Sequence, residues 1–300
     1  MIPVVPWLKN AVLQASKPQQ SIISVLKREL GGHRAGRSAD VLHASDITKS
    51  DFCARKWALF DLLEKGVESQ FIPTALDVTF RMGNVAERLV MEEWAGDAAV
   101  GHWQCRLCGL QRTMIAKPAG FCTTGVRHRW GYRQFVIEAP EYGLSGAIDG
   151  IFDVGAPHLL IAEIKTLNPT DFDTIMTPQP EHRLRTNLYL KMLAESNSPY
   201  KDKFNLSEAR VLYISRGYGK MNATWNEILP FREFVVKRQD SDLKEILQKA
   251  KAVKLSREGQ GMPTGICATA LDKIAKKCVV CKECFSGTYP AKFPVSSLSV

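Results

Sequence analysis

The sequence predicts an α/β fold in which helices flank a mixed central sheet. Three apolar, β-branched runs bounded by Gly and Pro lie within residues 134–167, as expected of neighbouring strands in a partly buried sheet. Patterns with helical spacing precede and follow these runs. The chain has 300 residues, 45% hydrophobic and 24% charged, so it can bury a sizeable core. We therefore expect one main domain with additions.

The N-terminal part is predicted to be a basic arm over residues 1–40, because its glycines interrupt a stretch rich in Lys and Arg. Residues 41–100 are predicted to be helical. Ser45 or Asp46 is a candidate N-cap for a first helix that includes Cys53.

A second helical pattern runs from Thr74 to Trp94. Its apolar positions share one face, and Glu87 and Glu92 fall elsewhere on the helix. The apolar face comprises Leu76, Phe80, Val85, Leu89 and Val90. Glu87 is thus not explained by packing.

The remaining chain divides into three predicted regions. Residues 101–133 carry Cys, Gly, Arg and aromatic residues without sustained periodicity, which indicates a small metal-bound insertion rather than a packed element. Residues 134–220 hold the strands, with a helix from Arg183 to Glu195 and a further strand, and form the expected core. Residues 221–300 hold a charged amphipathic helix and a Cys-rich tail.

Composition restricts the functional classes. A net charge of +9 and a pI near 9.1 favour a polyanionic partner such as nucleic acid over an acidic-substrate pocket. No apolar run approaches the roughly 18 residues of a membrane span, and no secretory leader is apparent, so we expect a cytoplasmic protein without a membrane partner. Eight cysteines in spaced groups then indicate metal ligands rather than disulfides.

Three residues form a candidate catalytic centre. Asp149 ends one predicted strand, and Glu163 and Lys165 lie two apart on the next, where they share one face. Converging carboxylates suit Mg²⁺ or Mn²⁺, which can polarise a phosphate and activate water, while a lysine orients that water or stabilises developing charge.

The alternative interpretation is structural. Asp149 could cap a turn beside Gly150, and Glu163 could pair with Lys165 in solvent. The apolar flanks of the second strand argue against it, because a charged pair in such a strand is costly without a purpose.

These motifs resemble the PD-(D/E)XK nucleases, in the branch of RecB-like and CRISPR-associated exonucleases, over roughly Ala44 to Phe285. The resemblance implies a restriction-endonuclease-like core. It also implies a further metal ligand in a G-x-x-x-H context, where this chain has Gly83 to Glu87. Glu87 is the substitute ligand that we expect, or else a solvated helix residue.

The family's Q-x-x-x-Y motif corresponds here to the segment from Arg185 to Tyr189. The glutamine is missing. The resemblance implies that Arg185 contacts DNA and that Tyr189 belongs to the catalytic site, although Tyr189 could equally be a core residue.

The first cysteine group predicts a zinc site, because Cys105 and Cys108 followed by Cys122 and His128 have Cys₃His spacing. His102 is the alternative fourth ligand. Nearby basic and aromatic residues are candidates for DNA binding: Arg127, Arg129 and Trp130. Alternatively, zinc only stabilises a loop that is too small for its own core.

The second cysteine group resembles the iron-sulfur site of the RecB-like branch, in which one early cysteine joins three late ones to bind a 4Fe-4S cluster. Five cysteines compete for four positions. We expect Cys53, Cys278, Cys281 and Cys284, with Cys267 as the alternative to Cys281. A second zinc site formed by the tail cysteines is the other possibility.

The expected function is metal-dependent hydrolysis of DNA, in recombination, repair or DNA processing. The branch implies an exonuclease acting on single-stranded or end-frayed DNA, with a recombinase or integrase as a potential protein partner. The alternatives are a structure-specific endonuclease and a catalytically silent DNA-binding or adaptor protein.

Overall fold

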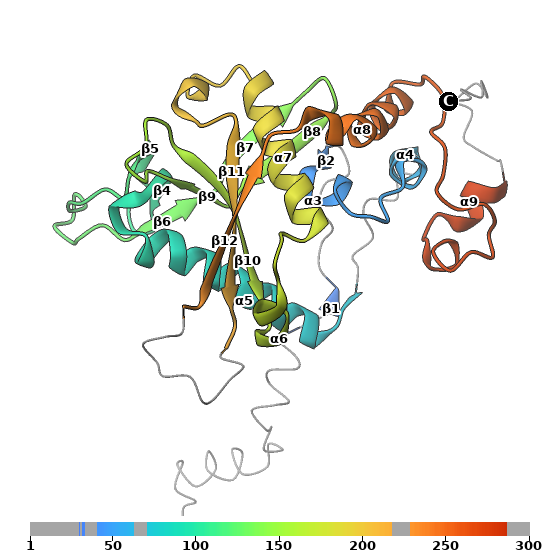
Figure 1. Cartoon of the computed structure of the whole chain (residues 1–300). Coiled ribbons are helices and arrows are strands. Elements are labelled where there is room, and N and C mark those ends of the chain that lie inside the picture. The colour runs from blue at the N-terminus through green and yellow to red at the C-terminus, as the bar shows by residue number, and fades with distance from the viewer. Residues whose placement is uncertain (1–29, 31, 34–40, 63–70, 218–228, 287–300) are drawn as a thin grey trace, which may run out of the picture.

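A computed structural model describes residues 30, 32–33, 41–62, 71–217 and 229–286 (Figure 1). The central sheet has seven strands in the order β12-β11-β10-β9-β4-β5, with β6 also paired to β4. Only β10 and β11 run parallel within it, so the sheet is mixed. The strands are β4 (Ala99–Cys105), β5 (Gln111–Ala116), β6 (Trp130–Arg133), β9 (Gly150–Phe152), β10 (Leu160–Leu167), β11 (Glu208–Ser215) and β12 (Phe231–Lys237). The predicted fold class, a mixed sheet flanked by helices, is confirmed.

A second sheet has three strands in the order β2-β8-β7. They are β2 (Leu42–His43), β8 (Leu144–Ile148) and β7 (Phe135–Ala139). The chain leaves β8, passes through Asp149 and enters β9 of the central sheet. The three predicted runs are therefore strands, but they belong to two sheets, because the chain changes sheet at Asp149. A short pair, β1 (Gly32–His33) with β3 (Phe71–Ile72), stands apart.

Helices cover the sheets and tie them together (Figure 1). The helix α7 packs against β11 and β10 of the central sheet and against β7 of the smaller sheet, and α5 crosses β10. The main hydrophobic core accordingly contains residues of both sheets and of α7, such as Ile148, Ile161 and Leu188. The α-helices are α3 (Ala44–Ile47), α4 (Ala54–Leu62), α5 (Thr74–Leu89), α6 (Pro169–Thr174), α7 (Pro180–Glu195), α8 (Lys244–Arg257) and α9 (Cys281–Ser286).

The first predicted helix is wrong in detail, because the structure has two helices, α3 and α4, in its place. An exposed turn over residues 49–51 separates them. Ser45 and Asp46 lie inside α3 rather than at a cap. Cys53 lies just before α4, where its carbonyl oxygen accepts from the Trp57 amide at 3.3 Å.

The predicted apolar face of the second helix is also wrong. Leu76 and Phe80 are 44% and 46% exposed, whereas Asp77 is buried and paired with Arg81. The burial is concentrated near the C-terminal end of α5 and in the π-helix (Val90–Trp94) that follows it. Which side of α5 is buried is therefore set by how its end meets the sheet, not by the count of apolar residues.

The region 101–133 was expected to lack regular elements, and the structure differs. Its chain forms most of β4, together with β5 and β6, and these strands continue the central sheet. The burial alternates along β4 over only a few residues, which is too short a pattern to distinguish from irregular chain.

The remaining predictions have a mixed outcome. The amphipathic helix of the C-terminal region is α8, preceded by a 3-10 turn (Asp240–Leu243). Of the basic arm, all but residues 30 and 32–33 lies outside the described residues. None of the helices in the described ranges is long and apolar enough to cross a bilayer.

Candidate active site

Asp149 lies at the junction between β8 and β9, where the chain passes from one sheet to the other. It is only 6% exposed, and its Oδ2 accepts from the backbone amide of Ile164 on β10 at 3.0 Å. The next residue, Gly150, allows a close approach, since a Cβ there would lie 2.9 Å from Sδ of Met91. The carboxylate is thereby fixed beside β10.

Glu163 and Lys165 lie on the same face of β10, as their spacing predicts. The Lys165 Nζ is 2.8 Å from Oε1 of Glu163 and 2.6 Å from Oδ2 of Asp149, and it also donates to the carbonyl of Ile164 at 2.9 Å. The lysine thus joins the two carboxylates. The structure brings together the three residues that the sequence predicts.

Glu87 reaches the same centre from α5 through Gln134, which lies between β6 and β7. The Nε2 of Gln134 donates to Oε1 of Glu87 at 2.7 Å and to Oδ1 of Asp149 at 3.0 Å. Glu87 therefore does not merely face solvent, because its carboxylate lies next to that of Asp149.

The electrostatics of the centre reflect crowded buried carboxylates. Burial, followed by the negative charge of Asp149, raises the pKa of Glu87 to about 8. Burial and the charge of Glu163 likewise raise the pKa of Asp149. Burial opposes the charged form of Lys165, but Asp149 and Glu163 outweigh it and raise its pKa. Three carboxylates thus face two side-chain cations, Lys165 and Arg185, and a bound cation would relieve the crowding that raises the pKa of Glu87 and Asp149.

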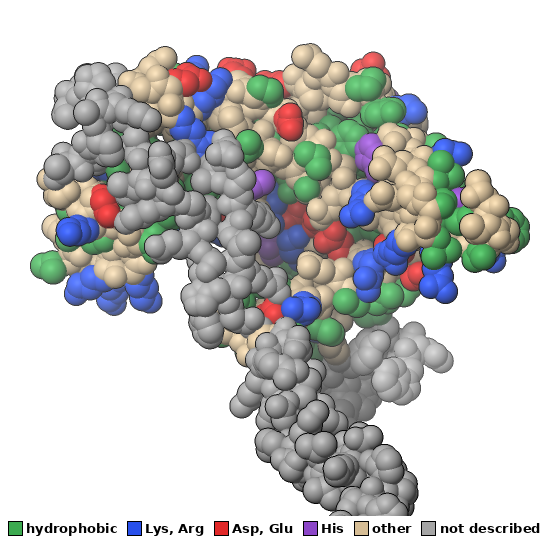
Figure 2. Space-filling model, turned by 180° about the vertical axis from the view of Figure 1, so that it is seen from behind, with side chains coloured by type: hydrophobic (Ala, Val, Ile, Leu, Met, Phe, Trp, Pro, Cys, Tyr) green, Lys and Arg blue, Asp and Glu red, His purple; other side chains and the backbone are tan. Residues whose placement is uncertain are grey.

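The arrangement fits a divalent cation. Three carboxylates supply the oxygen ligands that Mg²⁺ and Mn²⁺ prefer. Glu163 is 1% exposed, and its Oε2 has no hydrogen-bond partner among the described residues. A buried carboxylate oxygen without a partner is costly, and a metal ion would satisfy it. Figure 2 shows a hollow on this rear face of the molecule with acidic, basic and His side chains at its base.

Three residues of α7 face the centre at helical spacing. Arg185 donates from Nη1 to Oε1 of Glu163 at 2.6 Å, so its guanidinium is already engaged within the site. Tyr189 is 3% exposed, and burial followed by the charges of Glu163 and Asp149 raises its pKa. One turn before Arg185, His182 is 7% exposed, and its Nδ1 lies 2.8 Å from the hydroxyl of Tyr213.

Two of these neighbours, Gln134 and His182, are missed by the sequence. Gln134 begins a strand pattern and carries no motif. His182 lies just before the helix that the sequence predicts to begin at Arg183. It precedes Arg185 by three residues and Tyr189 by seven, and this helical spacing is a signal that would have identified it.

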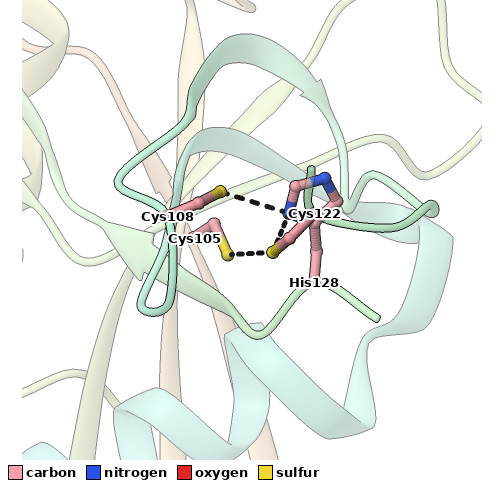
Figure 3. A group of neighbouring side chains, drawn as sticks. All are labelled: Cys105, Cys108, Cys122 and His128. Atoms are coloured by element: carbon pink, nitrogen blue, oxygen red, sulfur yellow. Dashed lines mark hydrogen bonds between the residues drawn. The ribbon is translucent and has the colours of Figure 1, made fainter. Parts of the chain in front are cut away.

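The first cysteine group converges as predicted (Figure 3). The ligand atoms of Cys105, Cys108, Cys122 and His128 lie within 4.8 Å of one another and can hold a metal ion. The Sγ atoms of Cys105 and Cys122 are 3.7 Å apart, and Sγ of Cys108 is 3.6 Å from Nδ1 of His128. Tetrahedral zinc requires about 3.8 Å between sulfurs and about 3.6 Å between sulfur and nitrogen.

The alternative ligand His102 lies elsewhere, because its Nδ1 contacts the hydroxyl of Thr113 and its ring stacks on Phe135. His128 is therefore the fourth member of the group.

The expected stacking of bases on Trp130 is contradicted by its burial. Trp130 is 6% exposed and packs its ring against that of His128 at 4.6 Å. Arg127 and Arg129 are exposed, as a role in DNA binding requires. Trp130 belongs to the core of the Cys/His insertion instead.

The second cysteine group lies on the opposite side of the central sheet, where α9 and its preceding loop approach α4 (Figure 1). Arg55 of α4 donates to the carbonyl of Pro263 at 2.8 Å, which fixes the tail against this helix. Burial, followed by the charges of Asp272 and of Cys53, Cys278 and Cys284, raises the pKa of Cys267. Cys278 and Cys284 pack against the cluster of Leu59, Phe60 and Val280.

Comparison with known proteins gives no sequence match to any protein family or curated protein. In structure the chain is similar to an alkaline exonuclease (LHK-Exo) from Laribacter hongkongensis, with 12% identity, a TM-score of 0.41, and coverage of 74% of this chain and 89% of that chain. The same exonuclease in complex with dAMP has 13% identity, a TM-score of 0.38, and coverage of 73% and 89%. The protein SSO0001 has 14% identity, a TM-score of 0.37, and coverage of 86% and 89%.

Proposed function

We propose that this protein is a Mg²⁺- or Mn²⁺-dependent deoxyribonuclease of the PD-(D/E)XK type, in its RecB-like branch. The observation that carries the proposal is the convergence of Asp149, Glu163 and Lys165, with a buried Oε2 of Glu163 that no described residue satisfies. The carboxylate of Glu87 at the same centre supports it.

Glu87, Asp149 and Glu163 would hold the cation, which polarises the scissile phosphate and lowers the pKa of a bound water. Lys165 stays protonated, because its two carboxylate neighbours raise its pKa. Its ammonium group is then placed to orient the attacking water and to stabilise the negative charge that develops on the phosphate. Arg185 pairs with Glu163, and Tyr189 is a buried neighbour of the site.

DNA is the proposed substrate. The net charge of +9 and the exposed Arg127 and Arg129 support a polyanionic partner. Exonuclease action on single-stranded or end-frayed DNA, and a recombinase or integrase partner, follow from the resemblance of the motifs to the RecB-like branch. A comparison of linear with circular DNA distinguishes this from the endonuclease alternative.

Two further metal sites complete the proposal. Zinc at Cys105, Cys108, Cys122 and His128 is supported by the convergence of their ligand atoms, which lie within 4.8 Å of one another. A 4Fe-4S cluster would be held by Cys53, Cys278, Cys281 and Cys284, with Cys267 as the alternative to Cys281. The packing of α9, which begins at Cys281, against α4, which begins just after Cys53, supports this site.

A second candidate function is that of a catalytically silent DNA-binding protein. The Arg185 guanidinium favours it, because it stands where the family has Gln and already pairs with Glu163. An ion pair at this carboxylate competes with a metal ion for the same negative charge.

Cleavage of labelled DNA decides between the two. The protein, purified without oxygen, is incubated with single-stranded and duplex DNA and Mg²⁺ or Mn²⁺, beside Asp149→Ala and Lys165→Ala. Asp153→Ala is the matched control, because Asp153 is exposed and bonds only a local amide among described contacts. Cutting that survives in the control and is lost in both site variants supports the nuclease. Binding without cutting by the folded, metal-loaded protein supports the silent alternative.

A further inference from the structure

Gln134 occupies a position between two carboxylates that the candidate chemistry needs close together. Its Nε2 lies 2.7 Å from Oε1 of Glu87 and 3.0 Å from Oδ1 of Asp149. With a cation bound, both groups are carboxylates, which accept but do not donate, so the amide nitrogen of Gln134, with its two hydrogens, is the end that faces both. One neutral side chain thus bonds α5 to the junction of β8 and β9.

Two buried carboxylates this close repel each other, and each would turn away if nothing held it. The remaining oxygen of Asp149 is already fixed by Ile164 and Lys165. Among the hydrogen bonds of the described residues, the one that holds the carboxylate of Glu87 comes from Gln134. The distance between Glu87 and Asp149 therefore depends on where Gln134 is held.

Gln134 is held by the strand that precedes it. It directly follows β6, which pairs with β4 from Cys105↔Trp130 to His102↔Arg133. The far end of this strand pair is closed by the Cys/His group, because Cys105 ends β4 and His128 stands two residues before β6. The metal-binding group and Gln134 are thus at opposite ends of one short strand.

Glu92 of the π-helix fixes the same strand from the side. Its Oε1 accepts from the amide of Tyr132 at 3.0 Å, and Nη2 of Arg106 donates to both of its oxygens at 2.6 and 2.8 Å. Glu92 is 6% exposed and lies five residues after Glu87 on the continuous α5 and π-helix. The helix that carries Glu87 and the strand β6 that precedes Gln134 are therefore joined, both through Glu92 and through Gln134 itself.

We propose that Gln134 is a positioning residue that sets the separation of Glu87 and Asp149, and that the Cys/His metal site acts on the catalytic centre by holding β6 and hence Gln134. This inference rests on the proposed function only in taking Glu87 and Asp149 as ligands of one cation. It gives the Cys/His insertion a role at the catalytic centre besides stabilising its own loop.

The test measures Mn²⁺ affinity directly, from the free-ion signal in electron paramagnetic resonance, on zinc-loaded full-length protein. The variants are Gln134→Ala, Gln134→Glu and, as a matched control, Gln248→Ala. Gln248 is exposed on α8, away from the paired strands β4 and β6. We expect Gln134→Ala to weaken Mn²⁺ binding about tenfold, the size of one hydrogen bond to a charged group. The control should bind as the unmodified protein does.

The dependence of nuclease activity on Mn²⁺ concentration is a second measurement, which would not change if Gln134 had only a structural role. In Gln134→Ala, activity at low Mn²⁺ should fall about tenfold and recover at saturating Mn²⁺, with KM for DNA unchanged. Gln134→Glu keeps the length but loses the donor, so it should also bind Mn²⁺ more weakly. If it binds as tightly as Gln or more tightly, the side chain is a ligand and the positioning role is wrong.

The link to the Cys/His site is tested with Cys108→Ser, an exposed member of that group. This change should weaken Mn²⁺ binding severalfold when Gln134 is present and add little in Gln134→Ala, because both act through the same side chain. Unchanged Mn²⁺ affinity in a folded Cys108→Ser protein that has lost its zinc would overturn the link.

The outcomes separate the two proposals. Mn²⁺ binding that follows this pattern in a protein that cuts no DNA leaves Gln134 in its role and removes the nuclease. If the protein cleaves DNA but Gln134→Ala binds Mn²⁺ as tightly as the unmodified protein does, the nuclease proposal stands and the positioning role of Gln134 is wrong. If Asp149→Ala binds Mn²⁺ as tightly as the unmodified protein, both are wrong.

Discussion

Nη1 of Arg185 lies 2.6 Å from Oε1 of Glu163, so a guanidinium of α7 and a carboxylate of β10 form a buried ion pair inside the candidate active site. The two residues are 9% and 1% exposed. Oε1 of Glu163 also lies 2.8 Å from Nζ of Lys165, so removing Arg185 leaves this buried carboxylate with one cation in place of two. Arg185 is therefore first a partner of Glu163, whatever contact it makes with DNA.

We expect Arg185→Ala to lower the free energy of unfolding by roughly 3 kcal/mol, the low end of the range for broken buried pairs, because Lys165 still pairs with Glu163. Arg185→Gln keeps a donor toward Glu163 and should cost less. Arg183→Ala is the control, because Arg183 pairs with Asp242 at the surface and such pairs contribute roughly 0–1 kcal/mol. Urea unfolding measures all three, and equal losses in Arg185→Ala and Arg183→Ala would contradict the prediction.

His182 predicts a pH dependence of stability. Burial, followed by the charges of Lys165 and Arg185, lowers its pKa to about 3. Between that value and the ordinary 6.5, the unfolded chain binds a proton that the folded chain does not, so stability falls as pH falls. From pH 7.5 to 5.5 this residue should cost about 1 kcal/mol of unfolding free energy.

The measurement compares urea unfolding at the two pH values in the unmodified protein and in His182→Gln, and the change on acidification should be about 1 kcal/mol more favourable in the variant. His158→Gln is the control, because His158 is exposed. If His182→Gln loses as much stability on acidification as the control, the histidine is not held neutral in the folded state.

Zinc should depend on Cys122 and not on His102. We expect Cys122→Ser to lose the bound metal, because its Sγ contacts both Cys105 and His128. His102→Ala should keep the metal, since His102 lies outside the group. Elemental analysis gives the zinc content, and retention of zinc by Cys122→Ser together with loss in His102→Ala would reverse the assignment.

The iron-sulfur proposal makes a choice between two cysteines. Cys281→Ser should lose most of its iron, whereas Cys267→Ser should retain it, because Cys281 begins α9, which packs against the helix that follows Cys53. Iron content and the visible absorption of protein purified without oxygen measure this. Loss of iron in Cys267→Ser alone would place Cys267 in the ligand set instead.

Local spacing in the sequence was sufficient for several features of the site. Glu163 and Lys165 share a face because alternate residues of any strand do, and their strand was recognisable from its apolar neighbours. The Cys/His group followed from ligand spacing in the same way. Features of this kind depend on residues close in sequence, whose relative positions the backbone geometry restricts before any packing occurs.

Other local patterns were misleading. Apolar residues of α5 such as Leu76 and Phe80 are exposed, and the strands of the Cys/His insertion did not stand out from irregular chain. In both places the environment of the segment, not its own periodicity, decides what is buried.

The sequence by itself determined the mixed α/β class, the Asp149, Glu163 and Lys165 centre, and the Cys/His group. Only the tertiary structure decided that Gln134 joins Glu87 to Asp149, that Arg185 pairs with Glu163, and that Arg55 of α4 holds the distant tail at Pro263. These pairs come from separate elements, and their contacts exist only after the sheets and helices have packed. The physical reason is that a contact between distant segments depends on the arrangement of the whole core, which no local periodicity encodes.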